Sequence, residues 1–295
     1  MTMFTDALKD ATYVTEAEIE ALLPEAEGPE AKLLEAMRYS SLAGGKRLRP
    51  FIVLSSADLF DVARSHSQRV AAAVEMVHTY SLIHDDLPAM DNDDVRRGKP
   101  TCHVKFDEAT AILAGDGLLT LAFEILSGEE THHNAIIRSQ LVVEMAKSLG
   151  VRGMVGGQML DVIAENQLFS VPEIARLQRM KTGSLINFSC QSGAILGDAE
   201  EGQRNMLNAF AHDLGLAYQI TDDLLDAEGT MEETGKAVGK DADAGKATFV
   251  SLLGVERARE QANILSEQAI KHLEIFEEKG NLLKSLVEYV VQRRS

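Results

Sequence analysis

Apolar residues recur at helical spacing along nearly the whole chain, and no stretch alternates apolar with polar residues as a half-buried strand would. Val70, Val74 and Val77 show this spacing within residues 66–87. Proline, which interrupts helices, accounts for only 6 of the 295 residues. Tryptophan is absent and aromatic residues make up 5%, which disfavours an aromatic-rich β-sandwich. The sequence therefore predicts an all-α protein that forms a single domain over residues 1–295.

Local signals predict where several helices begin and end. A capping box, in which Ser or Thr is followed three residues later by Glu, closes the first turn of a helix. Thr15 with Glu18 and Ser170 with Glu173 fit this pattern and are expected to start helices. Pro88 should end the preceding helix, because proline disfavours helical backbone in the residue before it. Further helices are expected at residues 29–43, 105–126, 200–226, 254–279 and 281–292.

Charge and cysteine usage exclude several classes of function. The chain has 29 basic and 46 acidic residues and a net charge of −17, whereas a nucleic-acid binder needs a basic face. Cys102 and Cys190 fit neither zinc-site spacing nor a disulfide framework. The first residues lack the features of a secretory signal, and the longest stretch without charged residues, 182–197, is too short to span a bilayer. We therefore expect a cytoplasmic protein without a membrane span.

Two acidic clusters occur next to apolar residues, at 85–94 and 221–226. In the first, Pro88 interrupts the helix, so Asp91 must return toward Asp85 through a turn. In the second, Asp222 and Asp226 lie four residues apart on one helix face, where like charges repel unless a cation compensates. Carboxylate oxygens favour Mg²⁺ or Ca²⁺ over zinc or copper. The clusters predict a divalent-cation site, and the alternative is a pair of solvated acidic surface runs.

Basic residues lie beside these clusters and after a glycine pair at 44–45, at Lys46, Arg47, Arg49, Arg96, Arg97, Lys236, Lys240 and Lys246. Carboxylates that bind Mg²⁺ and adjacent Arg and Lys side chains are what a diphosphate ligand requires. Ordinary surface ion pairing is the alternative, but it does not explain why the pattern occurs twice. His78 lies seven residues before Asp85, on the same helix face. This histidine is either a structural residue or a ligand-binding one.

Five sequence motifs occur in order, GGKRLRP (44–50), HDDLPAMDNDDVRRGKPTCH (84–103), KTG (181–183), YQITDDLLD (218–226) and GKDADAGKATF (239–249). Together they resemble the short-chain trans-prenyl diphosphate synthases, nearest to the bacterial farnesyl diphosphate synthases, over about residues 30–295. The resemblance implies an isoprenoid synthase fold of antiparallel helices around a deep central cavity, usually in a homodimer. It also implies condensation of an allylic diphosphate with isopentenyl diphosphate, with about three Mg²⁺ ions, or Mn²⁺, per active site.

The same resemblance implies roles for individual residues. Metal ligands or their supports would be Asp85, Asp86, Asp91, Asp222, Asp223 and Asp226. The allylic diphosphate would be held by Arg96, Lys181, Lys236 and Lys246. Isopentenyl diphosphate would be held by Gly45, Lys46, Arg49, His78 and Arg97. Thr182 and Gln219 would face the developing carbocation, and together with Lys181 they form the expected catalytic set. Gly183 is expected to loosen its helix, which would turn backbone carbonyls toward that cation.

Product length is the least constrained property. Tyr80, five residues before Asp85, would lie about 7–8 Å below it on a helix that rises 1.5 Å per residue, and Ser81 would lie one turn below. Tyr80 is therefore expected to close the cavity near the end of a C15 chain, unless it is simply part of the core. The alternatives are a geranylgeranyl or geranyl diphosphate synthase with the same chemistry, and a non-enzymatic regulatory subunit. Such subunits tend to lose one acidic cluster, and this chain keeps both.

Overall fold

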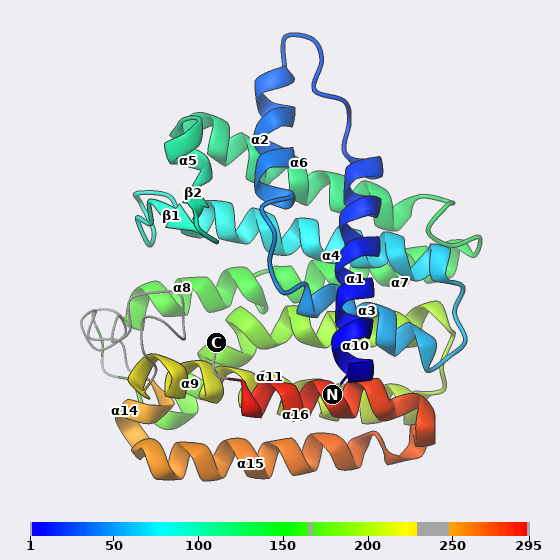
Figure 1. Ribbon diagram of the computed structural model, residues 1–295, viewed down its shortest axis with the longest axis vertical. Coiled ribbons are helices and arrows are strands. Elements are labelled where there is room, and N and C mark those ends of the chain that lie inside the picture. The colour runs from blue at the N-terminus through cyan, green and yellow to red at the C-terminus, as the bar shows by residue number, and fades with distance from the viewer. Residues whose placement is uncertain (1, 165–166, 168, 229–247, 294–295) are drawn as a thin grey trace. The chain divides into compact units, whose positions relative to one another are not determined.

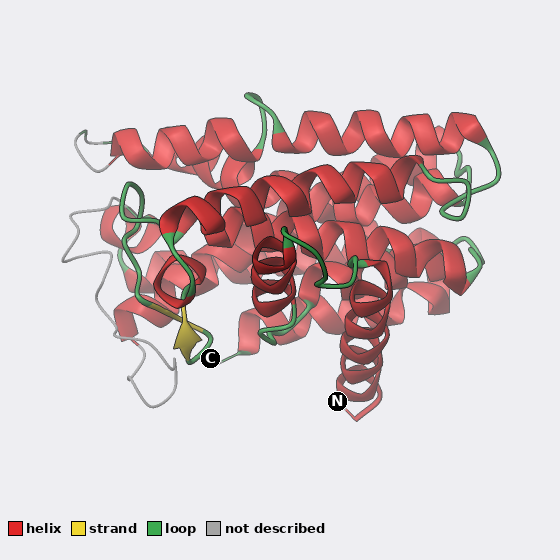
Figure 2. Ribbon diagram, turned by 90° about the horizontal axis from the view of Figure 1, so that it is seen from above, coloured by secondary structure: helices red, strands yellow, loops and turns green. Residues whose placement is uncertain are grey.

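The computed structural model describes residues 2–164, 167, 169–228 and 248–293. Its elements are helical apart from one two-stranded ladder, so the all-α prediction is confirmed (Figures 1 and 2). The chain divides into two compact units. The N-terminal unit comprises Thr2–Val142 with Ile195–Gly197, and the C-terminal unit comprises Val143–Ala194 with Asp198–Ser295. That residues 1–295 act as one domain around a central cavity stays a prediction.

The N-terminal unit is built around a buried central helix. Its elements are α1 (Thr2–Leu22), α2 (Ala31–Ser41), α3 (Leu48–Asp58), α4 (Arg64–Asp85), β1 (Val95–Arg96), β2 (Lys99–Pro100), α5 (Cys102–Lys105), α6 (Glu108–Ser127) and the first part of α7 (Ala135–Leu149). Helix α4 packs against α1, α3 and α6. Because small residues such as Ala71 and Ala73 are fully buried on it, neighbouring helices approach it closely. Its last residue, Asp85, lies three residues before Pro88, as the sequence predicts.

The capping-box prediction for Thr15 is wrong. Thr15 lies inside α1, which already begins at Thr2. The Thr15 side chain is fully buried, and its hydroxyl has no hydrogen-bond partner within the described part of the chain. The segment before Thr15 is helical because Phe4 and Ala11 are buried on it, as Ile19 is on the segment after it. Tertiary packing of these residues therefore overrides the local start signal at Thr15.

The short ladder is a second departure from the sequence-based prediction, which contains no strand. Val95 pairs with Pro100 and Arg96 with Lys99 in an antiparallel hairpin. The two turn residues, Arg97 and Gly98, have φ of 53° and 73°, which is the geometry that two-residue hairpin turns favour. Strands of two residues are too short to produce a period-2 pattern, so the sequence could not show them.

The C-terminal unit contains the second part of α7, α8 (Met154–Ala164), α9 (Val171–Gln178), the π-helix η1 (Arg179–Gly183), α10 (Ser184–Leu196), α11 (Glu201–Glu228), α14 (Phe249–Leu253), α15 (Val255–His272), the 3₁₀ helix η2 (Glu274–Gly280) and α16 (Asn281–Gln292). The predicted capping box of Ser170 and Glu173 is confirmed at the start of α9. The helix expected over 254–279 instead ends at His272, because the backbone of Glu277 is not helical.

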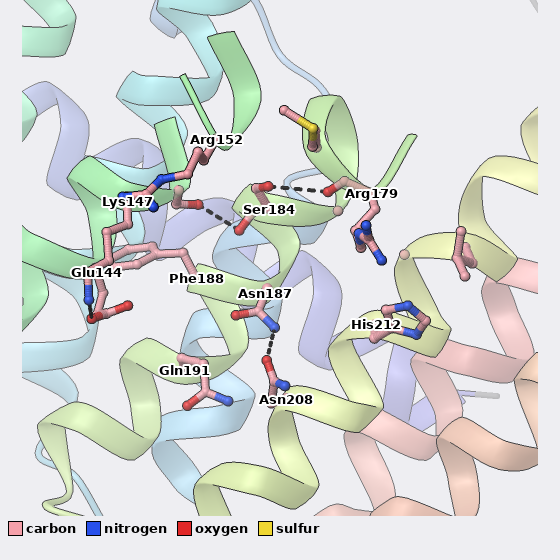
Figure 3. Close-up of a pocket in the computed structure, with 15 residues that line it drawn as sticks. Glu144, Lys147, Arg152, Arg179, Ser184, Asn187, Phe188, Gln191, Asn208 and His212 are labelled. Atoms are coloured by element: carbon pink, nitrogen blue, oxygen red, sulfur yellow. Dashed lines mark hydrogen bonds and ion pairs between the residues drawn. The ribbon is translucent and has the colours of Figure 1, made fainter. Parts of the chain in front are cut away.

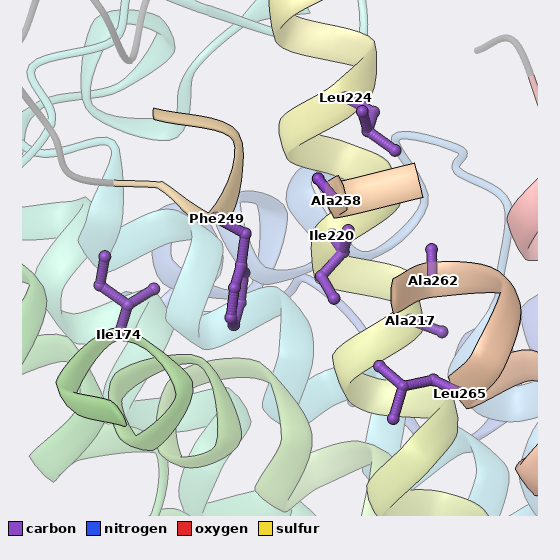
Figure 4. Packing of buried hydrophobic residues seen from close by; sticks show 8 residues of the cluster. All are labelled: Ile174, Ala217, Ile220, Leu224, Phe249, Ala258, Ala262 and Leu265. Atoms are coloured by element: carbon purple, nitrogen blue, oxygen red, sulfur yellow. The ribbon is translucent and has the colours of Figure 1, made fainter. Parts of the chain in front are cut away.

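Helix α11, which carries the second acidic cluster, is fixed by an apolar cluster against α15 and α14. Figure 4 shows its members, Ile174, Ala217, Ile220, Leu224, Phe249, Ala258, Ala262 and Leu265. The alanines on α11 and α15 leave room for the two helices to pack closely, and Phe249 fills the space beside α9. The rigid packing of α11 holds the residues at its C-terminal end in fixed positions.

One described helix, α6, is long and apolar enough to cross a membrane by length and composition alone. It has 20 residues, and its most apolar 18-residue stretch has a mean hydropathy of 1.6. Of that stretch, 44% is buried inside the structure. Ala111, Leu118 and Ala122 are fully buried on it, and α6 packs against α2 and α4. A core helix passes the same test, so this is weak evidence for a span.

Candidate active site

The first acidic cluster begins where α4 ends. The backbone N–H of Asp91 donates to the carbonyl of Asp85 at 2.8 Å, so the chain returns to the helix end through a turn, as expected from Pro88. Asp85 is half-buried and Asp91 is exposed, whereas Asp86 is only 3% exposed. The two outer carboxylates therefore lie where a cation could reach them, and Asp86 has a different environment.

Asp86 holds the hairpin that carries Arg96. The Nε–H of Arg96 donates to the two carboxylate oxygens of Asp86 at 2.6 and 2.9 Å, and a second guanidinium nitrogen lies 2.5 Å from Oδ1. Burial raises the pKa of the Asp86 carboxyl, and the adjacent Arg96 opposes that shift. The paired guanidinium compensates the buried carboxylate. This arrangement fits the supporting role expected for Asp86, and its role as a metal ligand stays a prediction.

Gly45, the second glycine of the GGKRLRP motif, lies against Arg97 of the β1–β2 hairpin. Gly45 has a φ of 127°, and a Cβ built there would lie 2.6 Å from Cζ of Arg97. The Arg97 guanidinium also donates to the carbonyl of Gly44. The backbone conformation at position 45 therefore favours glycine, and a Cβ there would displace the Arg97 guanidinium. The structure thus brings Arg97 against Gly44 and Gly45, and the adjacent Lys46 is exposed. Their role in one diphosphate subsite stays a prediction.

Arg49 and His78 are also brought together. A guanidinium nitrogen of Arg49 lies 3.2 Å from Nε2 of His78. Burial and then the positive charges of Arg49 and Arg97 hold the pKa of His78 well below its usual range. His78 is therefore neutral near pH 7 and can accept a hydrogen bond from Arg49 through Nε2. Whether it also contacts a ligand stays a prediction.

The second acidic cluster lies on α11, and its carboxylates again have unequal environments. Asp223 is 4% exposed and accepts from the backbone N–H of Phe249 at 2.8 Å and from Gln219 at 3.2 Å. Asp222 is half-buried and lies 2.5 Å from the guanidinium of Arg293, which stacks over a tyrosine ring. Asp226 is half-buried, one turn further along. Asp223 thus fixes the start of α14, whereas Asp222 and Asp226 are more accessible.

The motif KTG forms a π-helix, η1, so the expected loosening of the helix at Gly183 is confirmed. Lys181 donates to Asp161 of α8 at 2.7 Å, and the hydroxyl of Thr182 donates to Gln219 at 3.4 Å. A chain of contacts therefore runs from Thr182 through Gln219 to Asp223. The three residues predicted as catalytic are positioned in one unit by α8, η1 and α11.

Sequence reasoning missed Asp161 and Arg293. Asp161 is the only acidic residue of the apolar helix α8, and that isolation is the signal that could have identified it. Arg293 is 9% exposed, which is unusual for an arginine next to the last residue of a helix. No local pattern predicts its pairing with Asp222, because 71 residues separate the two.

Tyr80, the predicted chain-length residue, is 7% exposed on α4, and its ring meets that of His84 edge-on with centroids 5.6 Å apart. Burial, and then the charges of Asp85 and Asp116, raise the pKa of Tyr80 to about 12. Ser81 is half-buried and its hydroxyl donates to the carbonyl of His78. Tyr80 is therefore a neutral, buried ring, which is compatible with both a cavity floor and core packing.

A groove of about 390 Å³ lies in the C-terminal unit between α7, η1, α10 and α11 (Figure 3). Arg179 and Gly183 of η1 line it, together with Asn187 and Asn208, which are hydrogen-bonded to each other. Among the described residues, none of those predicted to bind substrate or metal lines this groove. The groove therefore abuts η1 without containing Lys181 or Thr182.

The donor set of the acidic clusters consists of carboxylate oxygens, which suits Mg²⁺ or Mn²⁺. Within the described ranges, no group of three or more His, Cys, Asp or Glu side chains is arranged to hold a metal ion. Asp85, Asp91, Asp222 and Asp226 are all partly or fully exposed, so they fit a metal-binding role by chemistry and accessibility. Lys236 and Lys246, predicted to bind the allylic diphosphate, lie outside the described residues.

Comparisons with known proteins agree with the sequence motifs. The Polyprenyl synthetase family model matches residues 30–290, which contain all five motifs. The chain is 43% identical to the farnesyl diphosphate synthase of Geobacillus stearothermophilus over 97% of this chain and 96% of that protein. It is 45% identical to the farnesyl diphosphate synthase of Escherichia coli (strain K12), over 88% and 89% of the two chains. The apo crystal structure of an FPP/GFPP synthase from Zymomonas mobilis matches with a TM-score of 0.91 and 46% identity, over 98% of this chain and 100% of that one.

Proposed function

The chain belongs to the polyprenyl synthetase family, and on that premise we propose that it condenses isopentenyl diphosphate with dimethylallyl or geranyl diphosphate to form farnesyl diphosphate. Its all-α isoprenoid synthase fold is shared with the solved relative from Zymomonas mobilis. The observation that carries the proposal is the identity of 43% to a farnesyl diphosphate synthase over 97% of the chain. A trans-prenyltransferase of this kind needs two diphosphate subsites and a water-free path for the carbocation.

The allylic diphosphate leaves as an anion, so charge accumulates on its oxygens as the C–O bond breaks. Fixed positive charge stabilises that transition state most, because the charge is largest there. Lys181 and Arg96 would supply it, and Lys236 and Lys246 would join them. Mg²⁺, about three ions per site, or Mn²⁺, would be held by Asp85, Asp91 and Asp222, supported by Asp86, Asp223 and Asp226, and would add further positive charge to the leaving diphosphate.

Thr182 and Gln219 would face the allylic carbocation. Their hydrogen bond orients the amide of Gln219, which in turn donates to Asp223. In the π-helix η1 the backbone of Lys181 and Thr182 departs from regular α-helical pairing, which frees carbonyl groups to face a cation. The released diphosphate would accept the final proton, because no side-chain acid–base pair presents itself in the motifs.

Isopentenyl diphosphate would bind at Gly45, Lys46, Arg49, His78 and Arg97. Arg49 and Arg97 offer planar guanidinium groups that can bind diphosphate oxygens in pairs. The neutral imidazole of His78 orients Arg49, since Nε2 accepts its hydrogen bond. The proposal further includes a cytoplasmic homodimer in which residues 1–295 act as one domain. The family match over residues 30–290 supports the single domain.

The test of this proposal is a product assay. Purified protein is incubated with Mg²⁺, isopentenyl diphosphate and each allylic starter in turn, and chain length is measured by chromatography of the dephosphorylated products. We expect a C15 product from both dimethylallyl and geranyl diphosphate, and no product after chelation of the metal. A C20 product from the wild-type protein would favour a geranylgeranyl diphosphate synthase, and no condensation at all would favour a regulatory subunit.

Substitution of Tyr80 is expected to lengthen the product. Removing the ring opens space below Asp85, so an active Tyr80→Ala enzyme should shift its main product from C15 to C20 or longer. Because loss of a buried aromatic ring costs about 3–5 kcal/mol of stability, products should be compared well below the melting temperature. Tyr80→Phe keeps the ring and is the matched control, with C15 expected. A Tyr80→Ala enzyme that still stops at C15 would place the end of the cavity on another helix.

A further inference from the structure

A buried carboxylate on α4 has no role in the sequence motifs or in the chemistry proposed above. Glu75 is 1% exposed and lies three residues before His78, about one helix turn away. Its carboxylate forms a close ion pair with Arg47 and lies 3.8 Å from a guanidinium nitrogen of Arg97. A buried carboxylate is costly to maintain unless it is paired, and here two guanidinium groups compensate it.

Both partners of Glu75 hold the segment between α2 and α3, which carries Gly45 and Lys46. The guanidinium of Arg47 donates to the carbonyl of Ser41, the last residue of α2, at 2.6 Å. Arg47 itself has a left-handed φ of 47° and precedes α3, so it fixes the end of the segment where α3 begins. Arg97 donates to the carbonyl of Gly44, in the middle of the segment.

These contacts divide the arginines of the basic motif by role. The side chain of Arg47 is fully buried, and its donors are taken by Glu75, Ser41 and Glu16. Lys46, which precedes Arg47, is exposed, and Arg49, which follows it, is half-buried. Burial lowers the pKa of Arg97, and Glu75 opposes that shift.

We propose that Glu75 is a positioning residue for isopentenyl diphosphate, and this inference rests on the proposed function. Glu75 touches no substrate. It holds Arg47 and Arg97 so that Gly45, Lys46 and the accessible face of Arg97 keep the arrangement that the diphosphate requires. Without the carboxylate, the buried guanidinium of Arg47 would lose its charge partner near the positive charge of Arg97, and the segment at 42–47 would lose the ion pair that joins it to α4.

A purely electrostatic role for Glu75 predicts the opposite sign. A negative charge near a diphosphate subsite weakens anion binding by Coulomb repulsion. If Glu75 did nothing but contribute charge, its neutralisation would lower the KM for isopentenyl diphosphate. If it positions the two arginines, the same substitution raises that KM. The direction of one kinetic constant therefore separates the two roles.

The experiment compares Glu75→Gln, which keeps the size of the side chain and removes its charge, with wild type. We expect the KM for isopentenyl diphosphate to rise at least about tenfold, as expected when one partner of a buried charge pair is lost. The KM for geranyl diphosphate should stay within about twofold, because Arg96, proposed for the allylic diphosphate, pairs with Asp86 rather than with Glu75. An unchanged or lowered KM for isopentenyl diphosphate overturns the positioning role.

Glu16→Gln is the matched control, since Glu16 shares the partner Arg47 at 3.0 Å but its side chain is 36% exposed. Its KM for isopentenyl diphosphate should change by less than about twofold, and a rise equal to that of Glu75→Gln contradicts a specific role for Glu75. If Glu75→Gln does not fold, Glu75→Asp takes its place. It keeps the charge and shortens the side chain, so the positioning role predicts a raised KM and a pure charge role predicts none.

Calorimetric titration of isopentenyl diphosphate into each folded variant gives a second readout that does not depend on turnover. A wild-type protein that neither binds isopentenyl diphosphate nor forms product overturns the proposed function together with this inference. A wild type that forms product, with a Glu75→Gln variant of unchanged affinity, overturns the positioning role alone.

Discussion

Asp85→Ala and Asp222→Ala are each expected to lower turnover by at least about 100-fold, the effect of removing one electrostatic stabiliser from an active site. The two carboxylates belong to different acidic clusters, and each is partly accessible at the end of its helix. Alanine is a strong helix former, so α4 and α11 should persist in the variants. Steady-state rates at saturating substrate and Mg²⁺, with circular dichroism to check the fold, measure the effect.

Asp6→Ala is the matched control for this pair, because Asp6 is an exposed aspartate on α1. Its turnover should equal that of wild type. Asp222 also pairs with the buried Arg293, so part of its effect could come from an unpaired cation. Asp222→Asn keeps a hydrogen-bond acceptor for Arg293 and should still lose about 100-fold. Normal rates with normal Mg²⁺ dependence in either alanine variant would contradict the proposal that both clusters bind metal.

Gly45→Ala is expected to raise the KM for isopentenyl diphosphate by about 100-fold, which corresponds to about 3 kcal/mol of lost binding free energy. Two effects combine at this position. The φ of 127° is rarely adopted by residues with a Cβ, and the new methyl group would lie 2.6 Å from Cζ of Arg97. The guanidinium must therefore move away from the carbonyl of Gly44. Initial rates at varied isopentenyl diphosphate and fixed geranyl diphosphate give the measurement.

Gly44→Ala separates the two effects. Gly44 has a φ of 88°, but a Cβ built there meets no atom within 4 Å. It should therefore show the backbone strain without the clash, and its KM should rise by no more than about tenfold. Equal effects of the two substitutions would mean that contact with Arg97 contributes nothing to binding. The KM for geranyl diphosphate should stay near the wild-type value in both variants.

The all-α fold and the residue types of the candidate site could both be predicted from the sequence. Helical spacing, few prolines and the stop at Pro88 predicted a helix over 66–87, within two residues of α4 at each end, because these signals act within a few residues of one another. The same holds for the start of α9 at Ser170 and for the loosened helix at Gly183. The two acidic clusters and their basic neighbours are also local patterns, so the order of residues along the chain is enough to reveal their composition.

Which members of each acidic cluster are accessible, and which are held by the fold, depends on tertiary packing. Asp85 and Asp86 are neighbours in sequence, but only Asp86 is buried against Arg96. Lys181 pairs with Asp161, which is 20 residues away in the sequence, and Asp222 pairs with Arg293, which is 71 residues away. The physical reason is that a buried charge must be paired, and its partner is supplied by whichever helix packs against it. Such pairs depend on packing between distant segments, which no local pattern of residues records.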